Sequence, residues 1–379
     1  MNALVLWGST DFGQPHFSGD ILWRTNFRAP DPVILMEIKE KSYLMVSPLE
    51  VERAEKEAEV DEVMNIMDYG ETEAEALEVF LKKHKVKNIA VPAVFNYQLG
   101  KALENNFKVV AVAPLFYPRR EVKNDREISE TERAQRAVEQ AMEKAMELLS
   151  DCIISGRCII RPPDFQHVLT SEYLKALIDL KLYSLGFLGV GTIVACGLQA
   201  ADQHCAGSGS LSAFEPIVIS VFPLSMKTHY WTGLTRTVFK GEPSAELKKM
   251  YGVVLKAQEH GIEMTRPGID GKEIYDWTIK YFENAGYPSD LKKRPMEGFF
   301  HGVGHGVGID IHEPPSIGRV SRILREGNVV TVETGLYYQR LRGHIPVGGI
   351  RIEDMILITK NGCRNFTKFP KNIKNMIII

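Results

Sequence analysis

Three histidines in one glycine-rich segment and two glutamates in apolar segments are the side chains of this sequence best suited to chemistry. His301, His305 and His312 stand in FFHGVGHGVGIDIHEPP, while Glu333 and Glu353 stand in VVTVETGLY and IRIEDMILI. Imidazole and carboxylate groups transfer protons and bind divalent metal ions. The combination predicts a site for acid–base or metal chemistry.

The two glutamates interrupt apolar runs that are typical of buried strands. A buried carboxylate is costly unless it is paired, hydrogen-bonded or bound to metal. Arg351 stands two residues before Glu353, so both side chains point to the same face of a strand. A buried Arg–Glu pair that stabilises a sheet is the ordinary interpretation. Two such glutamates after a histidine-rich loop favour a functional site.

The histidine segment has the wrong composition for a helix. His301 and His305 have the spacing of an HExxH pair, but Gly302 occupies the position of its glutamate. Glycines at every second position from 302 to 308 disfavour a helix and allow the backbone to approach a bound group. A single histidine is usually an ordinary core or surface residue, whereas three in one such loop favour function.

The elements that must position these residues divide the chain into two parts. In the first third, short apolar runs alternate with helical patterns, which favours a mixed-sheet α/β domain. Strands are expected at 3–6, 33–36, 43–46, 88–91 and 109–112, and helices at 49–60, 71–83 and 97–104. The second and third of these strands are close enough in sequence to form a hairpin.

A break near residue 121 separates the second part. Pro118 and the charged stretch RREVKNDRE interrupt the pattern there. The clearest helix is expected at 127–149, where Ser129 and Glu132 have the spacing of a capping box. Further helices are expected at 170–182 and 245–260, and strands at 190–197, 216–222, 230–240, 329–338 and 349–359.

The composition argues against several classes of partner. The 379 residues are 44% hydrophobic and 25% charged, with a formal net charge of −2. This balance gives no reason to expect nucleic acid or an anionic membrane as a partner. No apolar stretch approaches the length of a membrane span. Five cysteines without a CxxC pair favour reduced thiols, and we therefore expect a soluble cytoplasmic protein.

Several blocks of the sequence resemble one family. HGVGHGVGIDIHEPP, VVTVETGLY and GGIRIEDMILIT are similar to signature blocks of the Xaa-Pro dipeptidase (prolidase), aminopeptidase P and creatinase family. GTIVACGLQAADQHCAGSG resembles its substrate-side histidine segment, and VISVFPLSMKTHYWTGLTRTVFKG its metal-binding hairpin. The similarity is clear over about 120–370, and weaker in SGDILWRTNFRAPDP.

The resemblance implies an α/β (α+β) fold with two domains. Residues 1–121 would form an N-terminal mixed-sheet domain of the creatinase type, and residues 122–379 a pita-bread domain. The family commonly forms dimers, so a homodimer is the expected assembly. A small peptide or another small molecule is the expected ligand.

The metal site that the resemblance implies is incomplete. Family members that hydrolyse peptides bind two divalent ions through two aspartates, one histidine and two glutamates. Ser220 and Gly233 occupy the aspartate positions, and a shorter hairpin would place Phe222 in the first of them. The ligands that remain are His305, Glu333 and Glu353. We therefore expect no cofactor, or at most one weakly bound Mn, Zn, Co or Fe ion, and no dinuclear centre.

The resemblance also assigns roles to residues outside the metal set. The catalytic positions are His204, His301, His312 and Arg351, and the substrate-binding positions are Tyr230, His204 and His312. A dipeptidase-like protein with a degenerate metal site, and without efficient dinuclear catalysis, fits this set. A metal-free C–N hydrolase like creatinase, with His204 as general base, is an alternative. A non-catalytic peptide-binding or scaffold protein and a genuine metal-dependent Xaa-Pro dipeptidase are the others.

Overall fold

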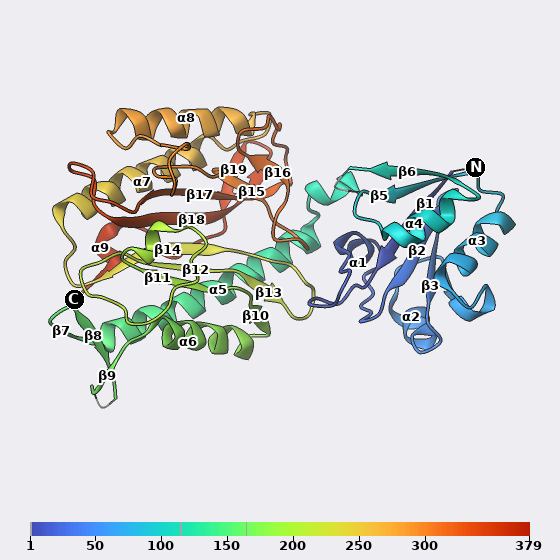
Figure 1. The fold of residues 1–379 in the computed structure, drawn as a ribbon, viewed down its shortest axis with the longest axis horizontal. Helices are drawn as coiled ribbons and strands as arrows, with labels where there is room; N and C mark the ends of the chain where they lie inside the picture. The colour runs from blue at the N-terminus through green and yellow to red at the C-terminus, as the bar shows by residue number, and fades with distance from the viewer. Residues whose placement is uncertain (1, 114–115, 164) are drawn as a thin grey trace. The chain divides into compact units, whose positions relative to one another are not determined.

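The protein divides into two compact units, each with its own core (Figure 1). The computed structural model describes residues 2–113, 116–163 and 165–379. The first unit is Met1–Arg120 and the second is Glu121–Ile379. Among the described residues, no helix is long and apolar enough to cross a membrane.

The N-terminal unit contains a six-stranded mixed sheet in the order β4-β3-β2-β1-β5-β6. Its strands are β1 (Asn2–Gly8), β2 (Val33–Ile38), β3 (Lys41–Val46), β4 (Glu62–Asn65), β5 (Asn88–Pro92) and β6 (Lys108–Val112). Its helices are α1 (Gly19–Thr25), α2 (Val51–Glu57), α3 (Glu73–Lys83) and α4 (Tyr97–Glu104). The predicted hairpin is confirmed, because β2 and β3 pair antiparallel. Lys39 and Glu40 have positive φ angles between these strands, as the tight turns of hairpins require.

Both faces of this sheet are covered, as the alternation of side chains along its strands shows. Val5 packs in one apolar cluster with Leu77 and Phe80 of α3. Its neighbour Leu6 packs in the other cluster, which includes Ile21 of α1. Successive residues of a strand point to opposite faces, so the unit has a helix–sheet–helix arrangement. This arrangement confirms the predicted α/β class.

The C-terminal unit is built on a nine-stranded sheet, in which β11-β12-β14-β18-β17-β15-β16 form a continuous path. These strands are β11 (Ile193–Cys196), β12 (Ile217–Val221), β14 (Leu234–Lys240), β15 (Gly304–Gly306), β16 (Glu313–Ile317), β17 (Val329–Tyr338) and β18 (Gly348–Thr359). Two further strands, β19 (Gly362–Asn365) and β20 (Ile377–Ile378), pair with β18 and β14. Small sheets are formed by β7 (Ile153–Ser155), β8 (Cys158–Arg161) and β9 (His167–Val168), and by β10 (Phe187–Gly189) and β13 (Pro223–Ser225).

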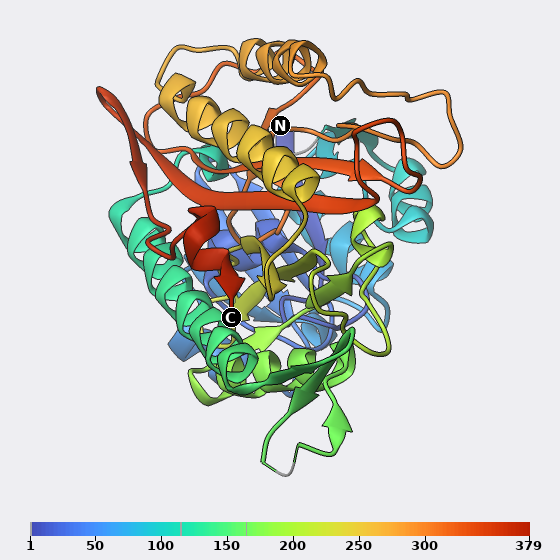
Figure 2. The same cartoon turned by 90° about the vertical axis from the view of Figure 1, so that its left-hand side faces the viewer.

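Long helices cover this sheet and share one apolar core with it. They are α5 (Asp125–Asp151), α6 (Ser171–Ser184), α7 (Ala245–Met264) and α8 (Gly271–Asn284), with the short α9 (Ile373–Met376) near the C-terminus. Figure 2 shows α7 running across β17 and β18. The α7 residues Met250, Val254 and Ala257 are fully buried in that core, so the helix fixes the two strands that carry the glutamates.

Several local predictions differ from the structure, as three examples show. Helix α5 begins earlier, because Asn124 and Glu127 form its capping box in place of Ser129 and Glu132. The Ser129 hydroxyl instead donates to a carbonyl within the helix. Strand β14 begins at Leu234 and not at residue 230. Helix α8, which the pattern did not predict, begins at Gly271, and Asp270 is its N-cap residue.

Candidate functional site

Four neighbouring strands place a row of polar side chains on one face of the C-terminal sheet. Glu333 of β17 lies opposite Glu353 of β18, which lies opposite Thr235 of β14, which lies opposite Ser220 of β12. The Thr235 hydroxyl donates to Glu353 Oε2 at 2.5 Å. Because a hydroxyl has one proton, the 2.5 Å contact between Ser220 Oγ and Thr235 Oγ1 has Ser220 as its donor. The result is a chain of hydrogen bonds from Ser220 to Glu353.

Gly233 lies at the end of this row, just before β14. A Cβ atom added to Gly233 would lie 2.7 Å from Glu353 Oε1 and 3.7 Å from Phe222 Cδ1. The first distance is shorter than van der Waals contact, so any side chain at position 233 requires the Glu353 carboxylate to move. Glu353 therefore lies where a side chain of residue 233 would begin.

Glu333 faces the histidine loop. Its Oε1 atom lies 3.6 Å from His305 Nε2, and the two side chains are 15% and 20% exposed respectively. The Nδ1 atom of His305 contacts Gly306 O at 3.0 Å. A carbonyl only accepts hydrogen bonds, so Nδ1 carries a proton and Nε2 is the atom directed at Glu333. The ring of His312 packs edge-on against His305, with 4.3 Å between centroids.

A second group of polar side chains lies further along the same face of β17 and β18. His301 Nδ1 donates to Gly302 O at 2.7 Å, and the Tyr337 hydroxyl lies 3.0 Å from His301 Nε2. Because Nδ1 holds the proton, Tyr337 is the donor to Nε2. Arg351 lies opposite Gly335, where a Cβ atom would collide with the Tyr337 hydroxyl. The glycine thus makes room for Tyr337 beside Arg351.

Arg351 is buried but incompletely hydrogen-bonded. The residue is 3% exposed, and its Nη1 donates to Gln203 O at 3.2 Å. Its Nε atom is buried without a hydrogen-bond partner among the described residues. An unpaired buried donor of this kind is uncommon and costly.

The last two predicted residues lie in different surroundings. His204 is exposed, and its backbone N–H donates to Asp202 Oδ1 at 3.1 Å. Burial, and then the nearby charge of His204, lowers the pKa of His312, which places His204 beside the histidine loop. Tyr230 is 8% exposed, and its hydroxyl donates to Glu127 Oε1 at 2.6 Å. The hydroxyl group of Tyr230 therefore donates its single proton to a residue in the first turn of α5.

Burial dominates the electrostatics of the site. It lowers the pKa of His301 to about 3 and the pKa of His305 to about 4. Burial, together with the charge of Glu353, raises the pKa of Glu333 to about 8, and burial also raises the pKa of Glu353. A protein environment that disfavours charge on these groups keeps both imidazoles neutral and retains a proton on the carboxylate pair at pH 7.

This set of donors does not fit a two-metal centre. Ser220 offers a neutral hydroxyl that is already hydrogen-bonded, and Gly233 offers no side-chain oxygen. Glu353 uses one carboxylate oxygen for Thr235. Within the described ranges, no group of three or more His, Cys, Asp and Glu residues is arranged to hold a metal ion. Two bridged dications need several anionic ligands, which this arrangement does not supply.

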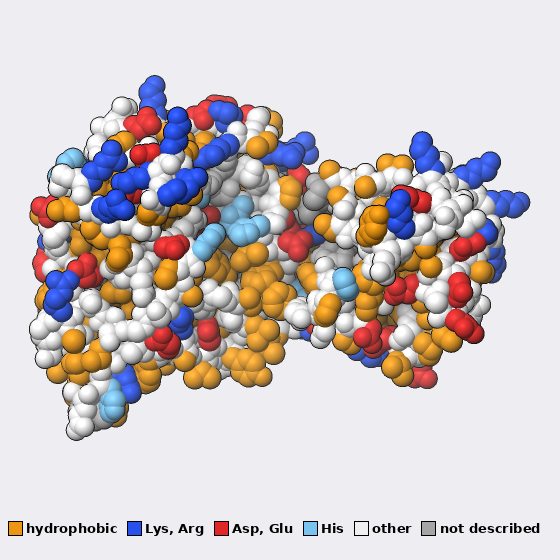
Figure 3. Space-filling model, viewed as in Figure 1, with side chains coloured by type: hydrophobic (Ala, Val, Ile, Leu, Met, Phe, Trp, Pro, Cys, Tyr) orange, Lys and Arg blue, Asp and Glu red, His pale blue; other side chains and the backbone are white. Residues whose placement is uncertain are grey.

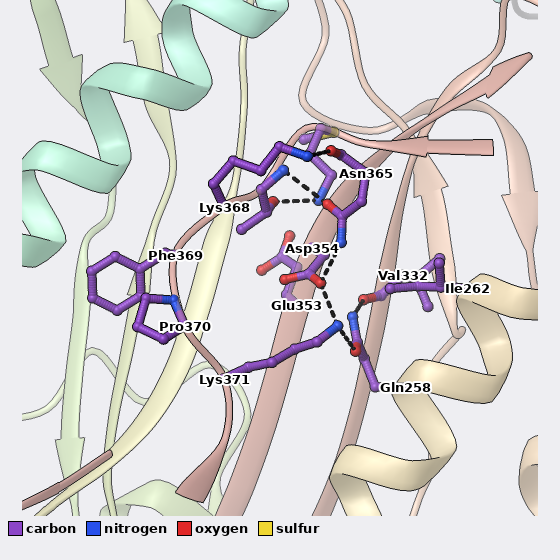
Figure 4. Close-up of polar contacts among 12 residues, drawn as sticks. Gln258, Ile262, Val332, Glu353, Asp354, Asn365, Lys368, Phe369, Pro370 and Lys371 are labelled. Atoms are coloured by element: carbon purple, nitrogen blue, oxygen red, sulfur yellow. Dashed lines mark hydrogen bonds and ion pairs between the residues drawn. The ribbon is translucent and has the colours of Figure 1, made fainter. Parts of the chain in front are cut away.

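The reverse face of β18 is held by a separate ionic network (Figure 4). Asp354, the neighbour of Glu353, points to that face and accepts from Arg236 Nη2 at 2.8 Å, Lys371 Nζ at 2.7 Å and Asn365 Nδ2 at 2.8 Å. Arg236 Nη1 also donates to the backbone carbonyl of Glu353 at 2.7 Å. The network therefore fixes the backbone that carries Glu353 from behind.

The structure brings most of the predicted site residues together. Figure 3 shows histidine side chains gathered on one face of the C-terminal unit. Thr235 and Tyr337 join the site although the sequence analysis did not select them. The sequence did contain a signal for both residues, because residues separated by an even number along a strand share one face. Tyr337 follows Glu333 by four residues, and Thr235 follows Gly233 by two.

Comparison with known proteins gives a consistent family. A model of metallopeptidase family M24 matches residues 129–360. The Xaa-Pro dipeptidase of Pyrococcus horikoshii is 28% identical over 340 residues, covering 88% of this chain and 86% of that protein. The prolidase structure from Pyrococcus furiosus superposes with a TM-score of 0.79 at 23% identity, covering 98% of this chain and 97% of that one.

A third similar protein extends the match in fold. The structure of an Xaa-Pro dipeptidase from Bacillus anthracis superposes with a TM-score of 0.81 at 23% identity, covering 99% of this chain and 94% of that chain. The predicted two-domain α/β architecture with a pita-bread C-terminal domain is confirmed.

Proposed function

The chain belongs to metallopeptidase family M24, and we propose that it is an Xaa-Pro dipeptidase-like member that binds small ligands without a dinuclear metal centre. The observation that carries the proposal is the Ser220–Thr235–Glu353 chain of hydrogen bonds. In this chain of hydrogen bonds, Glu353 has a hydroxyl group as its partner. A carboxylate that serves as a metal ligand would have a metal ion there instead. The space beside Gly233 is already used by the same Glu353 carboxylate.

The chemistry available to these residues differs from metal-assisted hydrolysis. Peptide hydrolysis at neutral pH needs an activated water and stabilisation of the developing oxyanion. His305 and His301 use Nδ1 for backbone carbonyls, which fixes both rings in one orientation. His305 can accept a hydrogen bond through Nε2, whereas His301 Nε2 already accepts one from the Tyr337 hydroxyl. The site is therefore equipped to position and hydrogen-bond a ligand, and inefficient at generating hydroxide.

Metal analysis of the purified protein tests this proposal. Elemental analysis after dialysis should find no pair of tightly bound ions per chain, and Xaa-Pro dipeptides should show little cleavage with added manganese, cobalt or zinc. The double variant Ser220→Asp with Gly233→Asp should gain metal, because it restores two carboxylates. The variant Ser220→Asn with Gly233→Asn is the matched control, with similar volume and no added charge.

Two results would overturn the proposal. One is a pair of tightly bound ions in the unaltered protein together with turnover that a chelator abolishes. The other is equal metal uptake by the Asp and Asn variants, since the missing carboxylates would then not limit binding.

A metal-free C–N hydrolase is the second candidate, and the position of His204 favours it. This histidine is exposed, and its charge affects the pKa of His312, so it lies where a general base could reach a substrate. Arg351 and Tyr337 lie in the same site. A screen of small amides and ureas in the presence of a chelator tests this activity, and the variant His204→Ala should abolish any turnover found. Turnover that persists in His204→Ala would exclude this mechanism.

A further inference from the structure

We propose that this site binds a small zwitterion, with a primary ammonium group held at Glu333, His305 and Glu353 and a carboxylate group held at Arg351. The proposal rests on the proposed function, because it assigns the ammonium to the place that a metal ion would occupy. It adds the chemical class of the ligand and the side chains that would recognise each end.

One end of the site is lined by hydrogen-bond acceptors. The 3.6 Å between His305 Nε2 and Glu333 Oε1 exceeds a direct hydrogen bond. Nε2 is an acceptor because Nδ1 donates to Gly306 O. Thr235 occupies only Oε2 of Glu353, and among the described residues no hydrogen bond engages Oε1. A primary ammonium group supplies three N–H donors, which matches these three acceptors.

At the other end, one atom of the Arg351 guanidinium group lacks an acceptor. Arg351 is 3% exposed, and its Nε has no partner among the described residues. A guanidinium group forms strong, directional hydrogen bonds with carboxylates. The Nε atom without a partner calls for a hydrogen-bond acceptor on the ligand. A ligand with a single charge would leave one end of the site unsatisfied.

The spacing of the two ends indicates a short ligand. Arg351 and Glu353 are two residues apart on the same face of β18, a separation of about 6.7 Å between Cα atoms. Two side chains that leave one strand face so close together favour a ligand with two charged groups near each other, as in an α-amino acid, where they share one carbon. The termini of an extended dipeptide lie further apart.

Calorimetric titration of the metal-free protein with L-alanine, ethylamine and propionate tests the inference. L-alanine carries both groups, while ethylamine and propionate each carry one, so L-alanine should bind at least about tenfold more tightly than either. Glu333→Gln and Arg351→Met should each weaken L-alanine binding by about tenfold or more. Arg340→Met removes an exposed arginine and is the control that should bind normally.

The outcomes separate this inference from the proposed function. Equal affinity for ethylamine and L-alanine would overturn the role of Arg351, and tighter binding of alanyl-proline than of L-alanine would overturn the assignment to a single amino acid. Absence of any binding to the folded, metal-free protein would overturn the inference and leave the proposed function intact. Two tightly bound metal ions would overturn both. Circular dichroism of each variant shows that a loss of binding does not reflect unfolding, and Arg351→Lys is the variant to use if Arg351→Met does not fold.

Discussion

Replacing Glu333 by glutamine should remove a pH dependence of stability that the buried carboxylate creates. The pKa of Glu333 rises from its usual 4.5 to about 8 because of burial and the charge of Glu353. The folded state therefore holds this proton more tightly than the unfolded state does. The stabilising effect is complete below pH 4.5 and is lost as the pH rises through about 8.

The size of the effect follows from this difference in pKa. At about 1.4 kcal/mol for each pH unit, the change from 4.5 to about 8 corresponds to roughly 5 kcal/mol. The Glu333 side chain is 15% exposed, and water at the carboxylate reduces the cost of ionisation, so we expect about 2–3 kcal/mol. Glu333→Gln cannot ionise, and should match the unaltered protein at pH 4 and exceed its stability by this amount at pH 9.

Urea unfolding at pH 4, 6.5 and 9 in the presence of a chelator measures this difference. The chelator matters because a bound cation would stabilise the ionised pair and hide the effect. Glu326→Gln, an exposed position in the turn before β17, is the control and should show no pH-dependent difference. A Glu333→Gln stability difference that stays constant from pH 4 to 9 would refute the reasoning.

Two further predictions concern the residues that support the site. Arg236→Met should lower the free energy of unfolding by about 3–5 kcal/mol, because it leaves the buried Asp354 carboxylate without its arginine. The double variant Arg236→Met with Asp354→Leu should recover part of this loss, and urea unfolding of all three proteins checks the order. Tyr337→Phe should cost about 1 kcal/mol by removing the donor to His301 Nε2. The NMR signals of the His301 ring should shift while those of the exposed His260 stay unchanged.

The sequence predicted the local structure correctly where its pattern was compatible with only one arrangement. The hairpin of β2 and β3 followed from two apolar runs separated by a short charged stretch. The sequence was compatible with two starting points for α5, because Asn124 with Glu127 and Ser129 with Glu132 both have the spacing of a capping box. Local pattern does not distinguish such pairs. The helix extends back to Asn124, which adopts the extended conformation of an N-cap.

The candidate site was predictable as a set of residues but not as a set of contacts. Glu333 and Glu353 stood out because carboxylates are unusual in apolar strands. The antiparallel register that places them opposite each other depends on the fold. The hydroxyl of Thr235 could not be selected, because threonine is common in strands and its role arises only from the neighbouring Ser220 and Glu353.

The two faces of β18 separate the candidate site from the contacts that hold the strand in place. Glu353 points to the site, while its neighbour Asp354 points to the reverse face and is held there by Arg236 and Lys371. Arg236 also binds the backbone carbonyl of Glu353. The pairing of β14 with β18 is thus stabilised by a network that uses the backbone of Glu353 but not its side chain. Substitution at position 220 or 233 changes the chemistry of one face and leaves this support intact.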